Sequence, residues 1–427
     1  MNRRQFMYIA AGAAAAAAFF GLKPKDSGAS YTPYFKELND ELKKRGPYKP
    51  AMLVDLDKLD RNIQTLITGL DRRLAYRIVA KSLPSPELLG HIMQTARTNK
   101  LMVFHQPFIN QVAERFPQAD LLVGKPIPVR SAETFYRKFS GQSGFEPSQQ
   151  LQWLIDTQQR LDQYQALAQK RKVRIRINVE IDIGLHRGGL QTSAELVPIV
   201  DQILADPEHL AFAGLMGYDA HAVKIPGILK SKEKAFTESQ AKYGEFLELL
   251  QSKYPQIHMN RLCLNGAGSP TVNLHKKETL INDIAAGSCL VKPTDFDLPT
   301  LQDYVPAAYI ATPVLKRLKG TTIPAIESLK GLLRWWDPNT RQVFFIYGGK
   351  WMARYESPGG LRDNGLYGPS TNQQMVNGSE NIDLNVDDHI FLRPAQSEFV
   401  FLQFGDLLAL RSGRIVDRWP ILREQES

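Results

Sequence analysis

The chain alternates between short apolar runs and longer segments in which apolar residues recur every three or four positions. Short apolar runs between turn residues predict buried strands, and the longer spacing predicts amphipathic helices. The predicted strands are Ala51–Leu56, Leu74–Ala80, Leu101–Phe104, Asp120–Val123, Gln152–Asp156, Val173–Ile181, Ala211–Tyr218 and Arg261–Leu264. The helices predicted between them are Leu59–Leu70, Pro86–Arg97, Phe108–Phe116, Ser131–Phe139, Gln158–Lys170, Ser193–Leu204 and Lys232–Lys253.

Eight strands that alternate with helices favour a parallel α/β architecture. No Gly-x-Gly-x-x-Gly motif opens the first helix, so a closed (β/α)8 barrel of the TIM type is favoured over a doubly wound sheet. We place this barrel at residues 50–300, after a polar lead at residues 30–49. Active sites in such barrels lie at the C-terminal ends of the strands.

After residue 300 the helical spacing disappears, and short β-rich runs separated by Gly, Pro and Asn turns take its place. This pattern predicts a smaller antiparallel β domain over residues 301–427. Its runs are Tyr309–Leu318, Leu329–Trp336, Arg341–Tyr347, His389–Leu392, Phe399–Phe404, Leu407–Arg411 and Arg414–Trp419. The stretch Glu356–Glu380 is rich in Gly, Asn, Ser and Pro and predicts a long loop.

Residues 1–29 have the pattern of a targeting segment rather than of the fold. Arg3 and Arg4 precede an apolar, Ala-rich run from Tyr8 to Leu22, and small residues follow at Ser27-Gly28-Ala29. The arginine pair resembles a twin-arginine export signal with a cleavage site. We therefore expect export by the twin-arginine machinery to the periplasm, with an uncleaved anchor as the alternative.

Composition excludes several classes. The chain is 43% hydrophobic and 23% charged, which is typical of a globular protein, and its formal net charge is +9. The basic residues are scattered, without a stripe that alternates with aromatic residues, so no nucleic-acid partner is expected. The two cysteines, Cys263 and Cys289, cannot form a multi-bridge framework, and we expect buried free thiols.

Lys81 is the first candidate for chemistry. It follows the predicted strand Leu74–Ala80 and precedes the Pro-rich segment Leu83–Pro86. A lysine at the end of a buried strand is placed for partial desolvation, which disfavours the ammonium form and makes the amine nucleophilic. Such lysines form Schiff bases with carbonyl compounds. A surface lysine just past a strand is the ordinary alternative.

The sixth predicted strand is unusually polar. Alternation places Arg174, Arg176, Asn178, Glu180 and Asp182 on one face, and the strand leads into Gly184 to Gly189 with Arg187 among them. Inside a barrel, such charges must be paired. For Glu180 and Asp182 a structural ion-pair ladder and a functional role are equally supported. For Arg176 and Arg187 we expect function.

The last two predicted strands end in residues that suit a flat, phosphorylated ligand. Tyr218 and His221 follow the seventh strand, where they could stack on a ring or bond to it. The eighth leads into Asn265-Gly266-Ala267-Gly268-Ser269, whose backbone N–H groups and hydroxyl suit a phosphate. With Lys81, these segments predict pyridoxal 5′-phosphate as cofactor, with the aldehyde at Lys81 and an arginine near the ring nitrogen.

The segments that carry this chemistry resemble a known family. The stretch from Pro50 to Ile63 is similar to the opening of the alanine racemase N-terminal-domain superfamily of fold type III. Arg77 to Ser82 resembles the Schiff-base segment of its D-threonine aldolase/D-serine dehydratase-like branch. The stretches from Glu180 to Gly189, Gly214 to His221 and Asn265 to Ser269 resemble further segments of that branch. The likeness covers residues 50–290 well and the β domain more loosely.

The resemblance implies roles for individual residues. Lys81 would be the Schiff-base and catalytic residue, with Arg187 and His221 as further catalytic candidates. Arg176 or Arg187 would contact the ring or the substrate. The remaining cofactor-binding candidates are Tyr218, Asn265, Gly266, Gly268 and Ser269. A homodimer is expected as well.

One departure from the branch concerns a metal. Its metal-dependent members carry a histidine, followed two residues later by cysteine or aspartate, in the C-terminal domain. Here Gln396 and Glu398 occupy those places, which disfavours a zinc site with nitrogen and sulfur ligands. An oxygen-only site for Mg²⁺ or Mn²⁺ stays open. Without a metal, the Lewis acid that polarises a β-hydroxyl would be missing.

The sequence therefore predicts an exported pyridoxal phosphate enzyme that acts on a small-molecule amino acid, as a lyase on a D-amino acid. An amino-acid racemase or a metal-independent deaminase of the same fold is the first alternative. A periplasmic protein that binds the cofactor or an amino acid without turnover is the second. A carbohydrate-acting barrel would need two nearby carboxylates, such as Glu180 and Asp182, and leaves Lys81 without a role.

Overall fold

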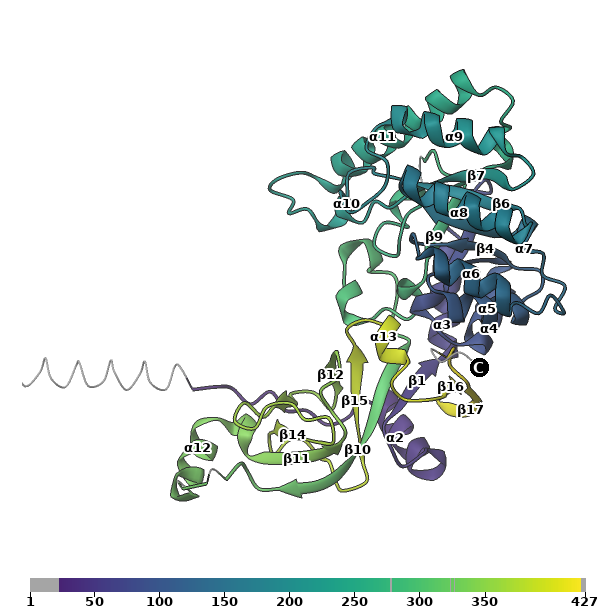
Figure 1. Ribbon diagram of the computed structural model, residues 1–427. Coiled ribbons are helices and arrows are strands. Elements are labelled where there is room, and N and C mark those ends of the chain that lie inside the picture. Colours follow the sequence, from purple (N-terminus) through teal and green to yellow (C-terminus); the bar gives the residue numbers. More distant parts are fainter. Residues whose placement is uncertain (1–22, 277–278, 323, 326, 424–427) are drawn as a thin grey trace, which may run out of the picture. The chain divides into compact units, whose positions relative to one another are not determined.

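The computed structural model describes residues 23–423, apart from 277, 278, 323 and 326 (Figure 1). Its contacts divide the chain into two compact units, and each contains separated stretches of sequence. Of the described residues, 54–308, 395–409 and 417–423 form the first, which we call the barrel unit. Residues 23–53, 309–394 and 410–416 form the second, which we call the β unit. The expected division at residue 300 is thus shifted slightly, and two short C-terminal stretches belong with the barrel unit.

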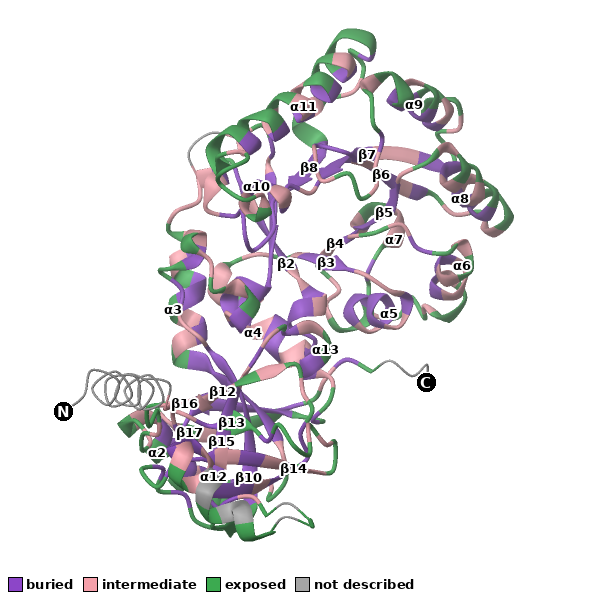
Figure 2. Ribbon diagram, turned by 90° about the vertical axis from the view of Figure 1, so that its left-hand side faces the viewer, coloured by how far each residue is buried: buried purple, intermediate pink, exposed green. Residues whose placement is uncertain are grey.

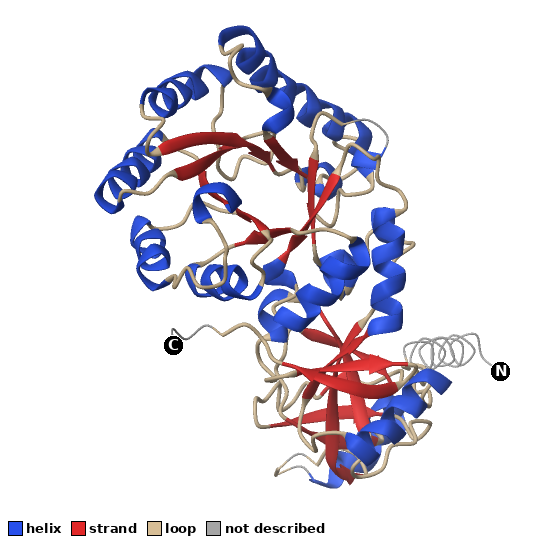
Figure 3. Ribbon diagram, turned by 90° about the vertical axis from the view of Figure 1, so that its right-hand side faces the viewer, coloured by secondary structure: helices blue, strands red, loops and turns tan. Residues whose placement is uncertain are grey.

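The barrel unit contains a closed barrel of eight parallel strands, β2 to β9, in chain order (Figure 3). The strands are β2 (Ala75–Val79), β3 (Lys100–Val103), β4 (Asp120–Val123), β5 (Leu151–Ile155), β6 (Ile175–Ile181), β7 (Leu210–Gly217), β8 (Cys263–Gly266) and β9 (Asp283–Ala286). Helices surround it: α3 (Leu56–Ile67), α4 (Pro86–Ala96), α5 (Gln106–Arg115), α6 (Val129–Lys138), α7 (Pro147–Gln150), α8 (Gln158–Arg171), α9 (Leu196–Ala205), α10 (His221–Lys224) and α11 (Lys232–Lys253). The predicted fold class is confirmed.

The first and the last strand of the barrel differ from those predicted. The first predicted strand, found as β1 (Ala51–Asp55), lies between β10 (Ala308–Leu318) and β16 (Leu407–Arg411) in the other sheet. The barrel is instead closed by β9, which pairs with both β2 and β8. Strand β9 is only four residues long and contains Asp283, so its apolar run is too short to predict a strand from the sequence.

Several helices begin at a side chain that caps them directly after a strand or loop. Asp55 accepts a hydrogen bond from the Lys58 N–H at 3.0 Å, and Thr157 accepts one from Arg160 at 3.3 Å. Ser231 does the same for α11. These contacts satisfy N–H groups that a helix cannot satisfy itself, so the chain turns into each helix at a defined residue.

The interior of the barrel has two layers. At the N-terminal ends of the strands lies a polar layer around Arg77, which no solvent reaches. Next to it is an apolar cluster of Met102, Leu122, Leu154, Met216, Cys263 and Ala285, with Val79 and Phe104 packed against it. Figure 2 shows the barrel strands coloured as buried while the outer helix faces are exposed. The apolar layer forms a floor beneath the strand ends.

The second sheet has nine strands. Seven follow the order β13-β14-β11-β10-β1-β16-β17, and β15 joins β10 to β12. Those not yet placed are β11 (Gln342–Tyr347), β12 (Ala353–Ser357), β13 (Arg362–Asp363), β14 (Gln373–Gly378), β15 (His389–Pro394) and β17 (Arg414–Trp419). The pairings within β10 to β15 are antiparallel, as predicted.

Three expectations for this region were wrong. The run Leu329–Trp336 ends in a helix, α12 (Lys330–Trp336), and Phe399–Phe404 overlaps the helix α13 (Glu398–Phe401). The predicted loop Glu356–Glu380 contains β13 and β14. Aromatic residues, which are common in strands, led to the prediction of strands in both helical runs. Gly and Asn, which are rare in strands, led to the prediction of a loop where β13 and β14 lie.

The first described residues belong to the β unit. Ser27 donates from its N–H and its hydroxyl to the Asn339 side-chain oxygen, both at 2.8 Å, and the Asn339 amide donates to the Lys25 carbonyl at 2.8 Å. Asn339 is completely buried, so this segment satisfies a buried amide. Of the predicted leader, residues 1–29, the part from 1 to 22 lies outside the described residues. No described helix is long and apolar enough to span a membrane.

Candidate active site

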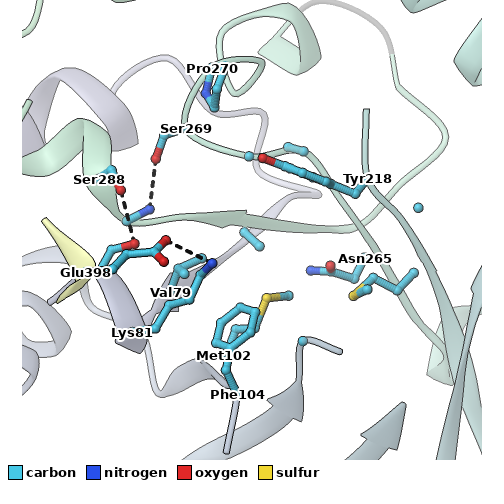
Figure 4. A pocket seen from close by; sticks show the side chains of 18 of the residues that line it. Val79, Lys81, Met102, Phe104, Tyr218, Asn265, Ser269, Pro270, Ser288 and Glu398 are labelled. Carbon is cyan, nitrogen blue, oxygen red and sulfur yellow. Dashed lines mark hydrogen bonds and ion pairs between the residues drawn. The ribbon is translucent and has the colours of Figure 1, made fainter. Parts of the chain in front are cut away.

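A cavity lies where β2, β7, β8 and β9 end, at the C-terminal side of the barrel. Its empty space, counted together with the open mouth, is about 680 Å³. The residues that line it come from the strand ends, from the loops after β8 and β9, and from α13 (Figure 4). The position agrees with the expectation for a barrel of this type.

Lys81 lines this cavity. It belongs to the short 3-10 helix Ala80–Ser82 that follows β2. Its Nζ lies 2.9 Å from Glu398 Oε1 and 4.5 Å from the centre of the Phe104 ring. The Lys81 side chain is 37% exposed. The expected apolar strand is present behind it, but the amine is paired with a carboxylate rather than desolvated and alone.

The glycine-rich loop after β8 forms another wall. Ala267 has a φ of +65°, and a Cβ atom on Gly268 would lie 2.5 Å from the Tyr218 ring, so only glycine allows this approach. The Ser269 hydroxyl accepts hydrogen bonds from the N–H groups of Gly287, at 3.1 Å, and Cys289, at 3.0 Å. The loop after β8 is therefore fastened to the loop after β9.

A buried network that the sequence did not reveal supports this loop. Asp219 is fully buried and lies 2.6 Å from both the Thr271 hydroxyl and His275 Nε2. Thr271 in turn accepts from the Gly268 N–H at 3.2 Å. Asp219 directly follows Tyr218, so its bond to Thr271 connects the segment after β7 with the glycine-rich loop. No sequence pattern links these positions, because they lie more than fifty residues apart.

Tyr218 and Arg187 both line the cavity, as predicted. The Arg187 guanidinium lies over the Tyr218 ring, with Cζ 5.1 Å from its centre, which is a cation–π arrangement. Burial raises the pKa of the Tyr218 hydroxyl, and Arg187 opposes that change. The phenol therefore stays protonated at neutral pH. Asn265, Gly268 and Ser269 also line the cavity, and Gly266 lies within β8 between them.

Two predicted site residues lie elsewhere. Arg176 lies near the start of β6, and its guanidinium donates to the Gln149 carbonyl. His221 begins α10, where its Nε2 lies 3.2 Å from the Ser239 hydroxyl and next to Gly184. Neither residue lines the cavity. The roles predicted for them stay predictions, while the structure places both side chains away from this cavity. Alternation along the strand gives the face on which Arg176 lies but not its depth in the barrel, and His221 is carried away because the chain turns after Tyr218.

The two acidic residues of β6 and its loop have different surroundings. Asp182 accepts from the N–H groups of Gly184 and His186 and lies 2.7 Å from His186 Nδ1, so it shapes the loop. For Glu180, burial and the neighbouring Asp156 raise the pKa to about 7, while Arg187 opposes the shift. Glu180 pairs in register with Met216 but does not line the cavity.

The candidate metal positions Gln396 and Glu398 do not gather around one point. Gln396 Nε2 donates to Asp295 Oδ2 at 3.4 Å, whereas Glu398 pairs with Lys81. In the described part of the chain, no group of three or more His, Cys, Asp and Glu side chains is placed to hold a metal ion. Both cysteines are buried and free, as expected, although Cys289 follows β9 rather than lying in a strand.

The cavity fits pyridoxal 5′-phosphate. Met102, Phe104, Met216 and Ala285 offer an apolar floor for a flat ring, and Lys81 offers an amine for an aldehyde. The close approach that Gly268 permits brings backbone to the cavity wall beside Ser269. Phe104, Ser82 and Ser288 also line the cavity, and sequence reasoning missed them because single apolar or hydroxyl residues give no signal.

Comparisons with known proteins agree with this geometry. The family described as alanine racemase, N-terminal domain, matches residues 54–294, which is more than half of the chain. No curated protein matches this sequence. Among solved structures, D-threonine aldolase from Filomicrobium marinum is similar at a TM-score of 0.69 and 16% identity, over 87% of this chain and 94% of that one.

Two further structures show the same fold. Alanine racemase from Bacillus anthracis has a TM-score of 0.65 and 13% identity, over 87% of this chain and 97% of that one. D-threo-3-hydroxyaspartate dehydratase from a Delftia species has a TM-score of 0.65 and 16% identity, over 88% and 98% of the two chains. The expectation of a pyridoxal phosphate enzyme that acts on amino acids is confirmed at the level of the family. The chain belongs to the alanine racemase N-terminal domain family.

Proposed function

We propose that this protein is a pyridoxal 5′-phosphate-dependent lyase that acts on a D-amino acid with a hydroxyl group on the β-carbon. The observation that carries the proposal is that Lys81 and the glycine-rich loop with Ser269 line one cavity above an apolar floor. Two of the similar structures, an aldolase and a dehydratase, are named for such substrates, which supports the choice of lyase.

Bound in this cavity, the cofactor would supply a sink for the electron pair released at the substrate's α-carbon. The protein's own residues have simpler tasks. Lys81 holds the reactive amine and moves a proton at Nζ. Arg187, at the cavity wall, is placed to hold the substrate carboxylate. Met102 and Met216 exclude water from below.

The decisive experiment locates the cofactor. Purified protein loaded with pyridoxal 5′-phosphate is reduced with borohydride, digested and mapped by mass spectrometry. The pyridoxyl mass is expected on the peptide that contains Lys81. Lys81→Ala should abolish this label, whereas Lys170→Ala, which changes an exposed lysine of α8, should keep it. A label elsewhere, or none, would refute the proposal.

A panel of D- and L-amino acids then separates the alternatives. Loss of a β-hydroxy-D-amino acid with formation of an aldehyde or a keto acid is expected. Inversion of configuration without cleavage would instead support the racemase, and a loaded cofactor without any turnover would support a binding protein. Light scattering of the purified protein tests the homodimer that we propose from the family resemblance.

We also propose export to the periplasm by the twin-arginine route, on the pattern of Arg3 and Arg4 before an apolar run. Changing both to lysine should leave the protein in the cytoplasm, and unchanged export would refute the assignment. The docking of Lys25 and Ser27 on Asn339 argues against cleavage at Ser27–Ala29, because cleavage there would remove partners of a buried amide. N-terminal sequencing of the exported protein tests this point.

A further inference from the structure

Glu398 is the feature of the cavity that the proposed function leaves unexplained. It begins α13, which belongs to the barrel unit although it is distant from Lys81 in sequence. Its Oε1 lies 2.9 Å from Lys81 Nζ, and its side chain is 41% exposed. In Figure 4 the two side chains point toward each other at one side of the cavity. A carboxylate therefore lies in direct contact with the reactive nitrogen.

A buried bridge of three hydroxyl groups holds this pair in place. Ser288 lies 3.1 Å from the Ser82 hydroxyl and 3.3 Å from that of Ser397. Ser82 is the neighbour of Lys81, and Ser397 is the neighbour of Glu398. All three serines are buried, where hydrogen bonds are strengthened by the low dielectric. The backbone positions of Lys81 and Glu398 are thereby fastened to each other, which an accidental surface ion pair would not require.

The other polar groups of the cavity cannot take a proton at neutral pH. The pKa of Tyr218 is raised by burial, so its hydroxyl stays protonated, and an arginine such as Arg187 does not deprotonate in proteins. The Asp219 carboxylate is occupied by Thr271 and His275. Among the described residues that line the cavity, Glu398 supplies the carboxylate.

We propose that Glu398 is a catalytic acid/base that serves the substrate's β-hydroxyl while Lys81 serves the α-carbon. This inference rests on the proposed function. In aldol cleavage the hydroxyl proton moves to the Glu398 carboxylate, the bond between the α- and β-carbons breaks, and the β-carbon leaves as an aldehyde. The electron pair of that bond stays with the α-carbon, which takes a proton from Lys81. Glu398 returns its proton to Lys81 across their contact of 2.9 Å.

The two residues thus form a closed proton circuit. One proton leaves the substrate at oxygen and one enters at carbon, so the step needs no oxidant, no reductant and no external base. In dehydration the circuit runs in reverse: the α-proton passes through Lys81 and Glu398 to the hydroxyl, which departs as water. Both directions need a group beside the lysine that can accept and return a proton, and the Glu398 carboxylate lies in that place.

The test uses Glu398→Gln, which keeps the shape of the side chain but cannot accept the proton. Cleavage of D-threonine should fall on the order of 10²-fold or more, as is usual for the loss of a general acid or base. Exchange of the α-hydrogen of glycine with deuterated solvent, which needs Lys81 but no hydroxyl, should fall less than tenfold. Glu398→Asp should recover part of the cleavage. Gln396→Ala, which changes a side chain outside the cavity, should alter neither rate.

A second measurement does not depend on turnover. In the wild type, D-threonine should raise the melting temperature more than D-2-aminobutyrate, which has the same skeleton without the hydroxyl. Glu398→Gln should lose that difference, because the amide is a weaker acceptor than the carboxylate. Equal losses of cleavage and exchange, or an unchanged preference for the hydroxyl in Glu398→Gln, would overturn the role of Glu398. A wild-type protein that takes up no cofactor would overturn the proposed function instead.

Discussion

Arg77 on β2 and Lys81 just after it are both cations, but the first has a structural role and the second lies at the candidate active site. Arg77 points into the polar layer at the base of the barrel, where its side chain is 0% exposed. Its guanidinium pairs with Asp283 at 2.7 Å and with Asp120 at 3.1 Å, and it also donates to the Leu101 carbonyl. Lys81, at the cavity, is 37% exposed and is paired with Glu398.

The difference lies in how completely each cation is satisfied. Burial by itself would lower the pKa of Arg77, but Asp283 and Asp120 outweigh it and raise the pKa well above its ordinary value. An arginine so enclosed has no free donor for a ligand and serves stability. Lys81 has a carboxylate beside it and an open cavity in front of it, so its nitrogen remains accessible to a carbonyl group.

Removing the amine of Lys81 should have the largest effect. Lys81→Ala is expected to lower turnover by roughly 10³-fold or more, because Lys81 is the lysine among the described residues that line the cavity. The free energy of unfolding should change by less than about 1 kcal/mol, since the pair with Glu398 is partly exposed. Steady-state kinetics and urea unfolding measure the two quantities. If Lys81→Ala lost much stability and little turnover, Lys81 would have the structural role that we assign to Arg77.

Removing the charge of Arg77 should have the reverse effect. Arg77→Met removes the buried cation that pairs with both Asp283 and Asp120 and leaves them the partly exposed Lys100, and breaking a buried pair costs about 3–5 kcal/mol. Turnover per folded molecule should stay within a few-fold of the wild type. Urea unfolding provides the measurement, and Lys81→Met is the matched control because the same exchange at the cavity should cost under about 1 kcal/mol. Equal costs at both positions would contradict the comparison.

Lowering the pH should reduce the stability that the polar layer around Arg77 contributes, between about pH 4 and pH 2. Burial would raise the pKa of Asp120, but Arg77 and Lys100 outweigh it and lower the pKa from 3.8 to about 2. Because the folded pKa lies below the unfolded one, the stabilisation is present above pH 4 and is lost as the pH falls toward 2. The shift corresponds to about 2 kcal/mol. Melting temperatures from pH 6 to pH 2 should fall more steeply for the wild type than for Asp120→Asn, and parallel curves would refute this.

The smallest effect is expected at Glu180, near the C-terminal end of the barrel. Burial and Asp156 raise its pKa from 4.5 to about 7. Since the folded pKa lies above the unfolded one, the fold loses stability as the pH rises from about 4.5 to 7 and Glu180 becomes charged. Glu180→Gln should be more stable than the wild type at pH 8, by about 1 kcal/mol after screening of the partly exposed carboxyl, and equal at pH 4. Melting curves at the two pH values test it.

The sequence was most informative where a local pattern repeats or where one residue lies at a strand end. The strands β2 to β8 and the placement of Lys81, Tyr218 and Arg187 at the cavity agree with the predictions. The failures involve distance along the chain. Strand β1 has the pattern of a barrel strand, yet pairing assigns it to the other sheet, and the short β9 closes the barrel in its place.

Depth within an element was the second source of error. Arg176 and Glu180 share a face of β6, but one lies near its start and the other near its end, and the register with β5 and β7 decides which approaches the mouth. The bonds of Asp219 to Thr271 and His275 were invisible for a related reason. Their partners are brought together by barrel closure rather than by spacing.

The sequence by itself determined the alternation of strands and helices, the family, and the lysine that follows β2, because these depend on short-range periodicity and local motifs. Only the tertiary structure decided that Glu398, more than three hundred residues later, would face Lys81 across 2.9 Å. The physical reason is that the contact depends on α13 packing with the barrel unit and on three buried hydroxyl groups contributed by separate segments. The spacing of residues along the chain does not show which distant segments will be joined by buried hydrogen bonds.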